Sequence, residues 1–183
     1  MDYRILGSTG LRVSRLCFGS LTIGPLQAGL DIEEGASVIR AAFDMGVNFI
    51  DTAELYRTYD YIRKAAEGRR KDIIISTKCY AYTGEGAEKS LRKALDELNT
   101  DYIDIFSLHE QESEHTLKGH QEAIEYFIRA KEKGYIRSIG ISTHAIAAVR
   151  ASLKYKDIEV LHPILNKRGL GIIDGDVNGM LEA

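Results

Sequence analysis

Two kinds of hydrophobic pattern alternate along this chain. The first is a short apolar run, often β-branched, that ends at a polar residue, which is typical of a strand buried in a parallel sheet. The second is a longer stretch with apolar residues every three or four positions, which is typical of an amphipathic helix. Strands are expected at 16–18, 47–51, 72–78, 102–109, 136–143 and 158–164, and helices at 36–43, 61–66, 87–98, 123–130 and 146–153.

The two ends of the chain carry further signals. Residues 3–6 and 11–13 flank a Gly-Ser-Thr-Gly turn, which predicts an N-terminal hairpin. Asp31, with Glu34 three residues later, has the spacing of a capping box and predicts the start of the first helix. A last helix is expected to begin at Asp174.

Strand–helix units that follow one another in this way indicate a parallel α/β protein. A doubly wound dinucleotide-binding sheet has Gly-x-Gly-x-x-Gly after its first strand, and the stretch from Gly19 to Gly24 does not match that motif. With the hairpin closing one end, the better prediction is a TIM-type (β/α)8 barrel, incomplete here with about six βα units. Residues 1–183 are expected to form this single partial barrel domain, and the pattern stops within a helix, as in a truncated barrel.

Composition narrows the class of protein. The chain has 183 residues, of which 44% are hydrophobic and 28% charged, as is ordinary for one globular domain. Its net charge of −3 argues against nucleic acid or an anionic membrane as a partner. The N-terminus has no apolar signal region and no 18 consecutive residues are apolar, so a cytoplasmic location is expected. Cys17 and Cys79 lack metal-ligand spacing and suit free thiols, and no metal site is expected.

Candidate chemistry gathers where the predicted strands end. Three consecutive strands end in Asp51, Lys78 and His109, and Tyr56 follows in the loop after the first of them. In a parallel barrel these four side chains would share one mouth. A tyrosine can protonate a carbonyl oxygen while a hydride reaches the carbon, and a nearby ammonium group is expected to lower its pKa from about 10. Asp51 would hold Lys78 in place, and His109 would orient the carbonyl oxygen.

Each of these residues alone also has a structural explanation. Asp51 can cap a turn between a strand and a helix, and Tyr56 is one of ten tyrosines that can simply be packed. Lys78 can be a surface charge, and His109 can be a hydrogen-bonded core histidine. The argument for a site is therefore the combination of four complementary groups at consecutive strand ends.

Three stretches of the sequence resemble the aldo-keto reductases. They are the opening Tyr-Arg-Ile-Leu-Gly-Ser-Thr-Gly-Leu-Arg-Val-Ser, then Phe-Ile-Asp-Thr-Ala-Glu-Leu-Tyr at 49–56, and Asp-Tyr-Ile-Asp-Ile-Phe-Ser-Leu-His at 101–109. The resemblance implies a (β/α)8 barrel that reduces a small aldehyde or ketone with NADPH and without metal. It also implies that Asp51, Tyr56, Lys78 and His109 are the catalytic tetrad.

The same resemblance implies a set of cofactor-binding residues. Gly19 and Ser20 resemble residues that line the nicotinamide end, next to Asp51, and Ser142 resembles the serine that binds the carboxamide. Thr143 and His162 are the remaining expected cofactor-binding residues. Both depart from the family pattern, in which an asparagine is usual at the position of Thr143 and a glutamine at that of His162.

Two functions stay open at this level. The tetrad favours a carbonyl-reducing enzyme, whereas the lack of the last two barrel strands, which carry cofactor contacts in the family, is expected to impair cofactor binding. The alternative is a noncatalytic binding or regulatory subunit, since the family also includes channel-associated subunits. Six strands would leave two open edges, so self-association through these edges is expected.

Overall fold

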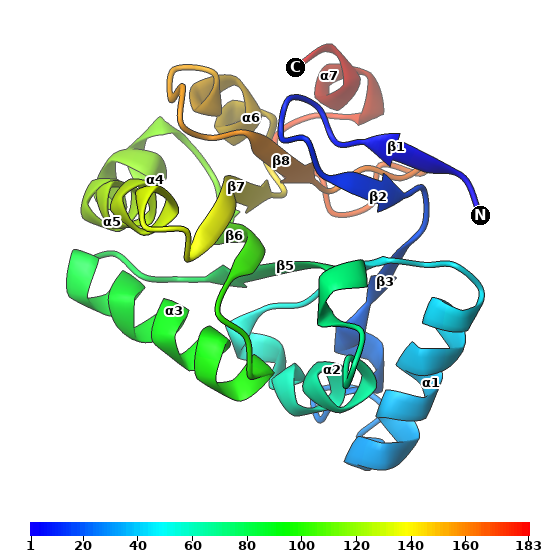
Figure 1. Ribbon diagram of the computed structural model, residues 1–183. Helices are drawn as coiled ribbons and strands as arrows, with labels where there is room; N and C mark the ends of the chain where they lie inside the picture. Colours follow the sequence, from blue (N-terminus) through cyan, green and yellow to red (C-terminus); the bar gives the residue numbers. More distant parts are fainter.

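The computed structural model describes residues 1–183 and contains a six-stranded parallel sheet with helices around its outer face (Figure 1). The strands follow one another in the order of the sequence, which is the arrangement of a barrel wall. They are β3 (Cys17–Gly19), β4 (Phe49–Asp51), β5 (Ile74–Cys79), β6 (Ile103–Gln111), β7 (Ile136–Thr143) and β8 (Val160–Pro163). The predicted α/β fold, six units of a TIM-type barrel, is confirmed.

The helices agree with the predicted ones apart from their ends and one addition. They are α1 (Ile32–Asp44), α2 (Tyr59–Ala65), α3 (Gly84–Leu98), α4 (Glu114–Gly119), α5 (Gln121–Glu132), α6 (Ile146–Ser152) and α7 (Val177–Glu182). Asp31 caps α1 by accepting a hydrogen bond from the Glu34 N–H at 2.8 Å, but no return bond from the Glu34 side chain is present. The capping box expected there is therefore only half formed.

The main core lies between the outer face of the sheet and the helices. All six residues of β5 are buried, as the uninterrupted apolar run predicted. Phe106 of β6 meets Phe127 of α5 edge to face, with ring centroids 5.0 Å apart. Burial of these large side chains is the principal favourable term that holds the helices on the sheet.

The predicted hairpin closes one end of the inner face. It consists of β1 (Tyr3–Ile5) and β2 (Arg12–Ser14), which pair antiparallel. Leu11 and Val13 form a second, smaller core with inward residues of three sheet strands, Ile74, Ile105 and Val160. The hairpin thus excludes water from the end of the sheet opposite the C-terminal strand ends.

The C-terminal segment corrects one predicted helix start. Asp174 does not begin the last helix; its carboxylate accepts hydrogen bonds from the backbone N–H groups of Ile146 and Ala147, at 2.7 and 2.9 Å, at the start of α6. Asp176 is the N-cap of α7, where it accepts from the Gly179 N–H at 2.9 Å. Two aspartates so close in sequence look alike, and only the fold shows which helix each one caps.

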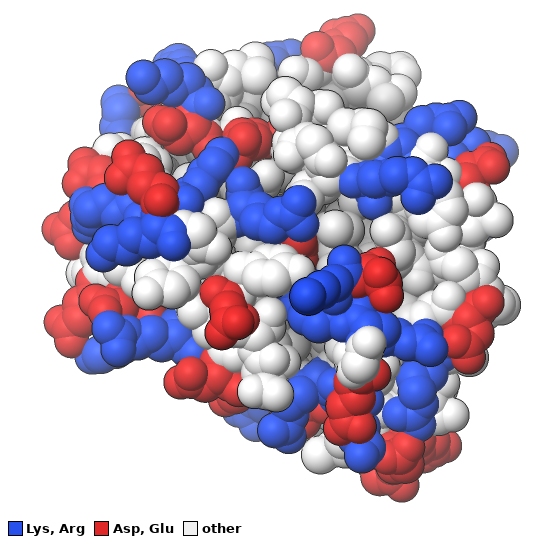
Figure 2. Space-filling model, viewed as in Figure 1, with Lys and Arg blue, Asp and Glu red and all other residues white.

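Both outer strands of the sheet have a single neighbour. β3 pairs only with β4, and β8 pairs only with β7. Figure 2 shows lysine, arginine and acidic side chains interspersed over the face in view. None of the helices has the length and apolar character needed to cross a membrane.

Candidate active site

The four candidate catalytic residues are brought to one end of the sheet. Asp51 is the last residue of β4, and Lys78 and His109 lie near the ends of β5 and β6. Tyr56 ends a short 3-10 helix, Glu54–Tyr56, which Arg57 terminates in the left-handed region with φ of 56°. Because the strands are parallel and adjacent, their carboxyl ends meet on the same rim, as the sequence pattern predicted.

Lys78 is buried and fully bonded. Its ammonium group donates to both carboxylate oxygens of Asp51, at 2.7 and 2.8 Å, and to the Thr52 carbonyl oxygen at 2.7 Å. An ammonium group has three protons, so these three bonds use all of them. The side chain is only 2% exposed, and such a buried charge is tolerated because it is paired and hydrogen-bonded. The expected role of Asp51 in holding Lys78 agrees with this geometry.

The Tyr56 side chain contacts both the histidine and the lysine of the site. Its Oη is 3.4 Å from Nε2 of His109, and Nζ of Lys78 is 5.3 Å from the centre of the Tyr56 ring. Burial raises the pKa of Tyr56 to about 12, and the carboxylates of Asp51 and Glu110 act in the same direction. The net shift of the Tyr56 pKa is therefore upward, opposite to the lowering expected from Lys78, because burial and the two carboxylates dominate it.

His109 is held as a neutral imidazole. Burial lowers the pKa of His109 to about 4, and the positive charge of Lys78 adds to the effect. Its Nε2 faces the Tyr56 hydroxyl, while its Nδ1 is buried without a hydrogen-bond partner. The ring of Tyr80 stacks on the imidazole, with centroids 4.6 Å apart and planes inclined by 28°. A neutral imidazole beside a protonated phenol can share the oxygen of one bound carbonyl group.

Ser142 and His162, two of the candidate cofactor residues, line a cavity of about 180 Å³ with Tyr56, Lys78 and His109. The Ser142 hydroxyl accepts a hydrogen bond from the Glu110 N–H at 2.9 Å, which leaves its own proton free to be donated. His162 turns instead toward Asp51, with Nδ1 3.5 Å from the carboxylate.

The other candidate cofactor residues differ in their placement. Thr143 lines the cavity, but its hydroxyl is engaged with the backbone of Ala145, donating at 3.1 Å and accepting at 2.8 Å. Gly19 is exposed at the end of β3, next to Asp51 in the adjacent strand. Ser20 does not line the cavity, because it is fully buried and its hydroxyl bonds that of Thr58 at 2.8 Å.

The cavity wall offers polar groups that can hold one end of a nicotinamide cofactor. The free proton of the Ser142 hydroxyl suits a carboxamide oxygen, and the uncharged side chains of Tyr56 and His109 suit an uncharged ring. At about 180 Å³ the cavity is smaller than the roughly 300–1,000 Å³ of ordinary ligand pockets. It is therefore too small for a whole dinucleotide. No group of three or more His, Cys, Asp or Glu side chains is arranged to hold a metal ion.

Two residues of the site were not found by sequence reasoning. Glu110 follows His109 directly and lines the cavity, and Tyr80 covers the imidazole. Glu110 has φ of 51°, and a register shift between β6 and β7 falls between Leu108 and Gln111. An irregularity of this kind re-aims side chains next to active sites, and the sequence carries no turn residue that announces it.

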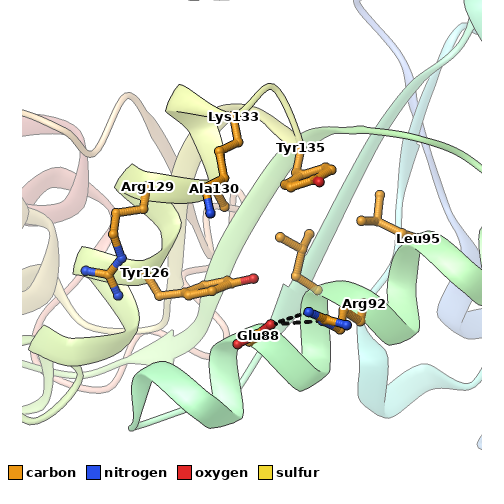
Figure 3. Close-up of a pocket in the computed structure, with 9 residues that line it drawn as sticks. Glu88, Arg92, Leu95, Tyr126, Arg129, Ala130, Lys133 and Tyr135 are labelled. Atoms are coloured by element: carbon orange, nitrogen blue, oxygen red, sulfur yellow. Dashed lines mark hydrogen bonds and ion pairs between the residues drawn. The ribbon is translucent and has the colours of Figure 1, made fainter.

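A larger hollow of about 530 Å³ lies on the outer surface between α3 and α5 (Figure 3). Basic side chains and two tyrosines line it, and Arg92 is paired with Glu88 of the same helix, Nε to Oε1 at 3.0 Å. It contains none of the strand-end residues. The smaller cavity on the rim is therefore the candidate site.

Comparison with known proteins identifies the relatives of this chain. The family model described as Aldo/keto reductase family matches residues 15–166. An uncharacterised oxidoreductase of Bacillus subtilis, YqkF, is 30% identical over 173 residues, which cover 86% of this chain and 54% of that protein. L-galactose dehydrogenase of Arabidopsis thaliana is 30% identical over 154 residues, which cover 78% of this chain and 48% of that protein.

A third relative and the solved structures complete the comparison. A probable voltage-gated potassium channel subunit beta of Arabidopsis thaliana is 30% identical over 188 residues, covering 91% of this chain and 54% of that protein. The holo form of the aldo-keto reductase AKR11C1 from Bacillus halodurans superposes with a TM-score of 0.80 at 30% identity, covering 92% of this chain and 60% of that one. The chain spans about half the length of the curated relatives it matches.

Proposed function

Because the chain belongs to the aldo/keto reductase family, we propose that it reduces an aldehyde or ketone with NADPH, with Tyr56 as the proton donor. The single observation that supports this most is the convergence of Tyr56, His109 and the Lys78–Asp51 pair on one cavity. NADPH supplies the hydride that is added to the carbonyl carbon. Since the family shares nicotinamide-dependent carbonyl chemistry, the choice of NADPH over NADH is part of the proposal.

The residues of the site divide the remaining work among them. Tyr56, protonated because its pKa lies near 12, donates its proton to the carbonyl oxygen. His109 fixes the position of that oxygen beside the hydroxyl. The Lys78 ammonium, held by Asp51, stabilises the phenolate that Tyr56 becomes once the proton has left. Ser142, Thr143 and His162, with Gly19 and Ser20 near the rim, are proposed to hold the nicotinamide end.

Replacement of Tyr56 tests the proposal directly. Tyr56→Phe removes the proton donor and keeps the ring, so the rate of NADPH oxidation with a test aldehyde should fall about 10²–10⁴-fold. The control is Tyr135→Phe, which removes a hydroxyl at the distant hollow between α3 and α5 and should leave the rate unchanged. Near-normal turnover by Tyr56→Phe would overturn the assignment of the donor, and no turnover by the unmodified chain would overturn the enzymatic proposal.

The second candidate function is a noncatalytic binding or regulatory subunit on the same scaffold. The similarity to potassium channel beta subunits of plants favours it, although that role belongs to those proteins. A chain of this kind would bind NADPH, as a titration of tyrosine fluorescence would measure, without oxidising it in the presence of any aldehyde. Turnover abolished by Tyr56→Phe separates the enzyme from this alternative.

The proposal includes the location, the cysteine redox state and the self-association of the chain. We expect residues 1–183 to act as one domain in the cytoplasm, where Cys17 and Cys79 stay free thiols. The open edges at β3 and β8 support self-association of the chain.

A further inference from the structure

Glu110 places a carboxylate without a cationic partner on the wall of the candidate site. It lines the same cavity as Tyr56, Lys78 and His109, and it forms no salt bridge. The lysine of this cavity is already neutralised by Asp51. Glu110 therefore contributes a negative charge that no group on the wall compensates.

The Glu110 carboxylate is exposed to solvent at the rim of the cavity, and two contacts restrict the residue. The Glu110 backbone lies in the left-handed region, with φ of 51°, which is unfavourable for a residue with a side chain. Its N–H bonds the Ser142 hydroxyl at 2.9 Å, and the Tyr80 hydroxyl donates to carboxylate oxygen Oε2. Tyr80 itself is stacked on His109. A strained residue fixed from two sides next to the reacting groups points to a functional constraint.

One carboxylate oxygen stays available for a ligand. The bond from Tyr80 goes to Oε2, and no other residue of the chain bonds Oε1. An ionised carboxylate accepts through both oxygens, so Oε1 can accept from a cationic donor inside the cavity. The neighbouring imidazole of His109 is neutral, because its pKa lies near 4, and does not compete for this oxygen.

We propose that Glu110 is a specificity-determining residue that selects carbonyl substrates bearing a cationic group, such as an ammonium or guanidinium, and disfavours carboxylates. The inference rests on the carbonyl-reducing function proposed above. The reaction itself is unchanged, since the hydride goes to the carbonyl carbon and the proton to its oxygen. Glu110 acts by attracting the charged end of the substrate and by repelling an anion.

Three para-substituted acetophenones test the effect of charge alone, since the cation chosen has no hydrogen-bond donor. They are para-trimethylammonioacetophenone, its neutral isostere para-tert-butylacetophenone, and the anionic para-carboxyacetophenone. For the unmodified chain, kcat/KM should be up to about 5-fold higher for the cation than for the neutral ketone, and lower by a similar factor for the anion, as is usual for an exposed charge pair. The preference should weaken as salt is raised.

Matched variants locate the effect. Glu110→Gln should abolish the preference, whereas Glu112→Gln, an equal change of charge at an exposed position two residues later that does not line the cavity, should leave it intact. Tyr80→Phe keeps the ring stacked on His109 and keeps the Glu110 carboxylate, but it removes the hydroxyl that bonds this carboxylate. The ratio of kcat/KM between the cationic and neutral ketones should therefore fall without reaching one. A preference that persists in Glu110→Gln would overturn the inference.

A binding measurement separates this inference from the proposed function. Dissociation constants of the three ketones, measured by ligand-observed NMR, need no turnover. Cation-selective binding lost in Glu110→Gln, in a chain that oxidises no NADPH with any test aldehyde or ketone, would support the charge preference and overturn the enzymatic function. Reduction of the neutral ketone without any charge preference would do the reverse, and a chain that binds none of the three ketones would overturn the charge preference.

Discussion

At the scale of single residues, the site stabilises the neutral forms of its proton-carrying groups. Burial raises the pKa of Tyr56 to about 12 and lowers that of His109 to about 4, so each is uncharged at neutral pH. The one full positive charge, on Lys78, is balanced by Asp51. Tyr56 thus carries its proton at neutral pH, and its raised pKa makes the charge of Lys78 important during the transfer, when the phenolate forms.

The low pKa of His109 predicts how stability depends on pH. An unfolded chain would protonate this histidine near its ordinary pKa of 6.5, whereas the folded chain does so only near 4. The unfolded state therefore binds more protons between these values, and the free energy of unfolding should fall as the pH drops from about 6.5 to about 4. After allowance for solvent screening, the loss due to His109 at pH ~5 should be about 1 kcal/mol.

Urea unfolding at neutral and acidic pH checks this. The control is His115→Gln, on the exposed side of α4, which should keep the acid sensitivity. His109→Gln has no group to titrate and should lose part of it. An equal pH dependence for His109→Gln and the unmodified chain would show that other groups carry the effect.

The placement of the three strand-end residues and of Tyr56 in the loop after β4 could be predicted from the sequence. The reason is that adjacent parallel strands end on the same side of the sheet, independently of how the helices pack. The direction of the Tyr56 pKa shift could not be predicted, since it depends on whether the Lys78 ammonium group donates its hydrogen bonds to Asp51 or to Tyr56. Glu110 escaped prediction for a similar reason. Its position depends on a register shift in the β6–β7 pairing, which has no marker in the sequence.

At the scale of elements, one buried aspartate ties three strands together at the end opposite the site. Asp104 of β6 is fully buried. Its carboxylate forms salt bridges with the guanidinium groups of Arg70, at 2.9 Å, and of Arg137 of β7, at 2.7 Å. It also accepts the Ile75 N–H of β5 at 3.0 Å. The Tyr102 ring lies against the Arg70 guanidinium at 4.2 Å, which adds to the packing of this cluster.

Asp104→Asn should destabilise the chain by about 2–3 kcal/mol, because it weakens two charge-assisted bonds while keeping the side-chain shape. Asp101→Asn, at an exposed position of the preceding turn, should change the free energy of unfolding by less than about 0.5 kcal/mol. Both can be measured by urea unfolding at neutral pH. Equal effects of the two substitutions would mean that the cluster adds no stability beyond that of an exposed charge.

The elements that were predicted well are those with strong periodicity, such as β7, which the structure places at Ile136–Thr143 as expected. α4 was not predicted, because its six residues are mostly polar and only Leu117 is buried. This helix is stabilised instead by a capping box between Ser113 and Thr116. Short helices fixed by caps, rather than by an apolar face, give little periodic signal.

At the scale of the whole molecule, the sheet is a barrel wall with two open edges. β3 and β8 each lack a second neighbour, and Leu161 of β8 is 37% exposed. Just after β8, Ile164 packs on the small core of Ile146, Val149 and Met180. Open strand edges are templates for pairing with another chain.

We therefore predict that this chain associates with itself at micromolar concentration. The unpaired backbone groups of β3 and β8 can bond a second strand, and pairing would also bury the exposed Leu161 side chain, so pairing of the edges is favoured. Sedimentation velocity should show a mass that grows with concentration. Leu161→Lys places a charge on the β8 edge and should weaken the association, whereas Leu153→Lys, at a 71% exposed position just after α6, should not. A monomer over the whole concentration range, with cooperative unfolding, would show that the open edges are adequately solvated by water and need no partner.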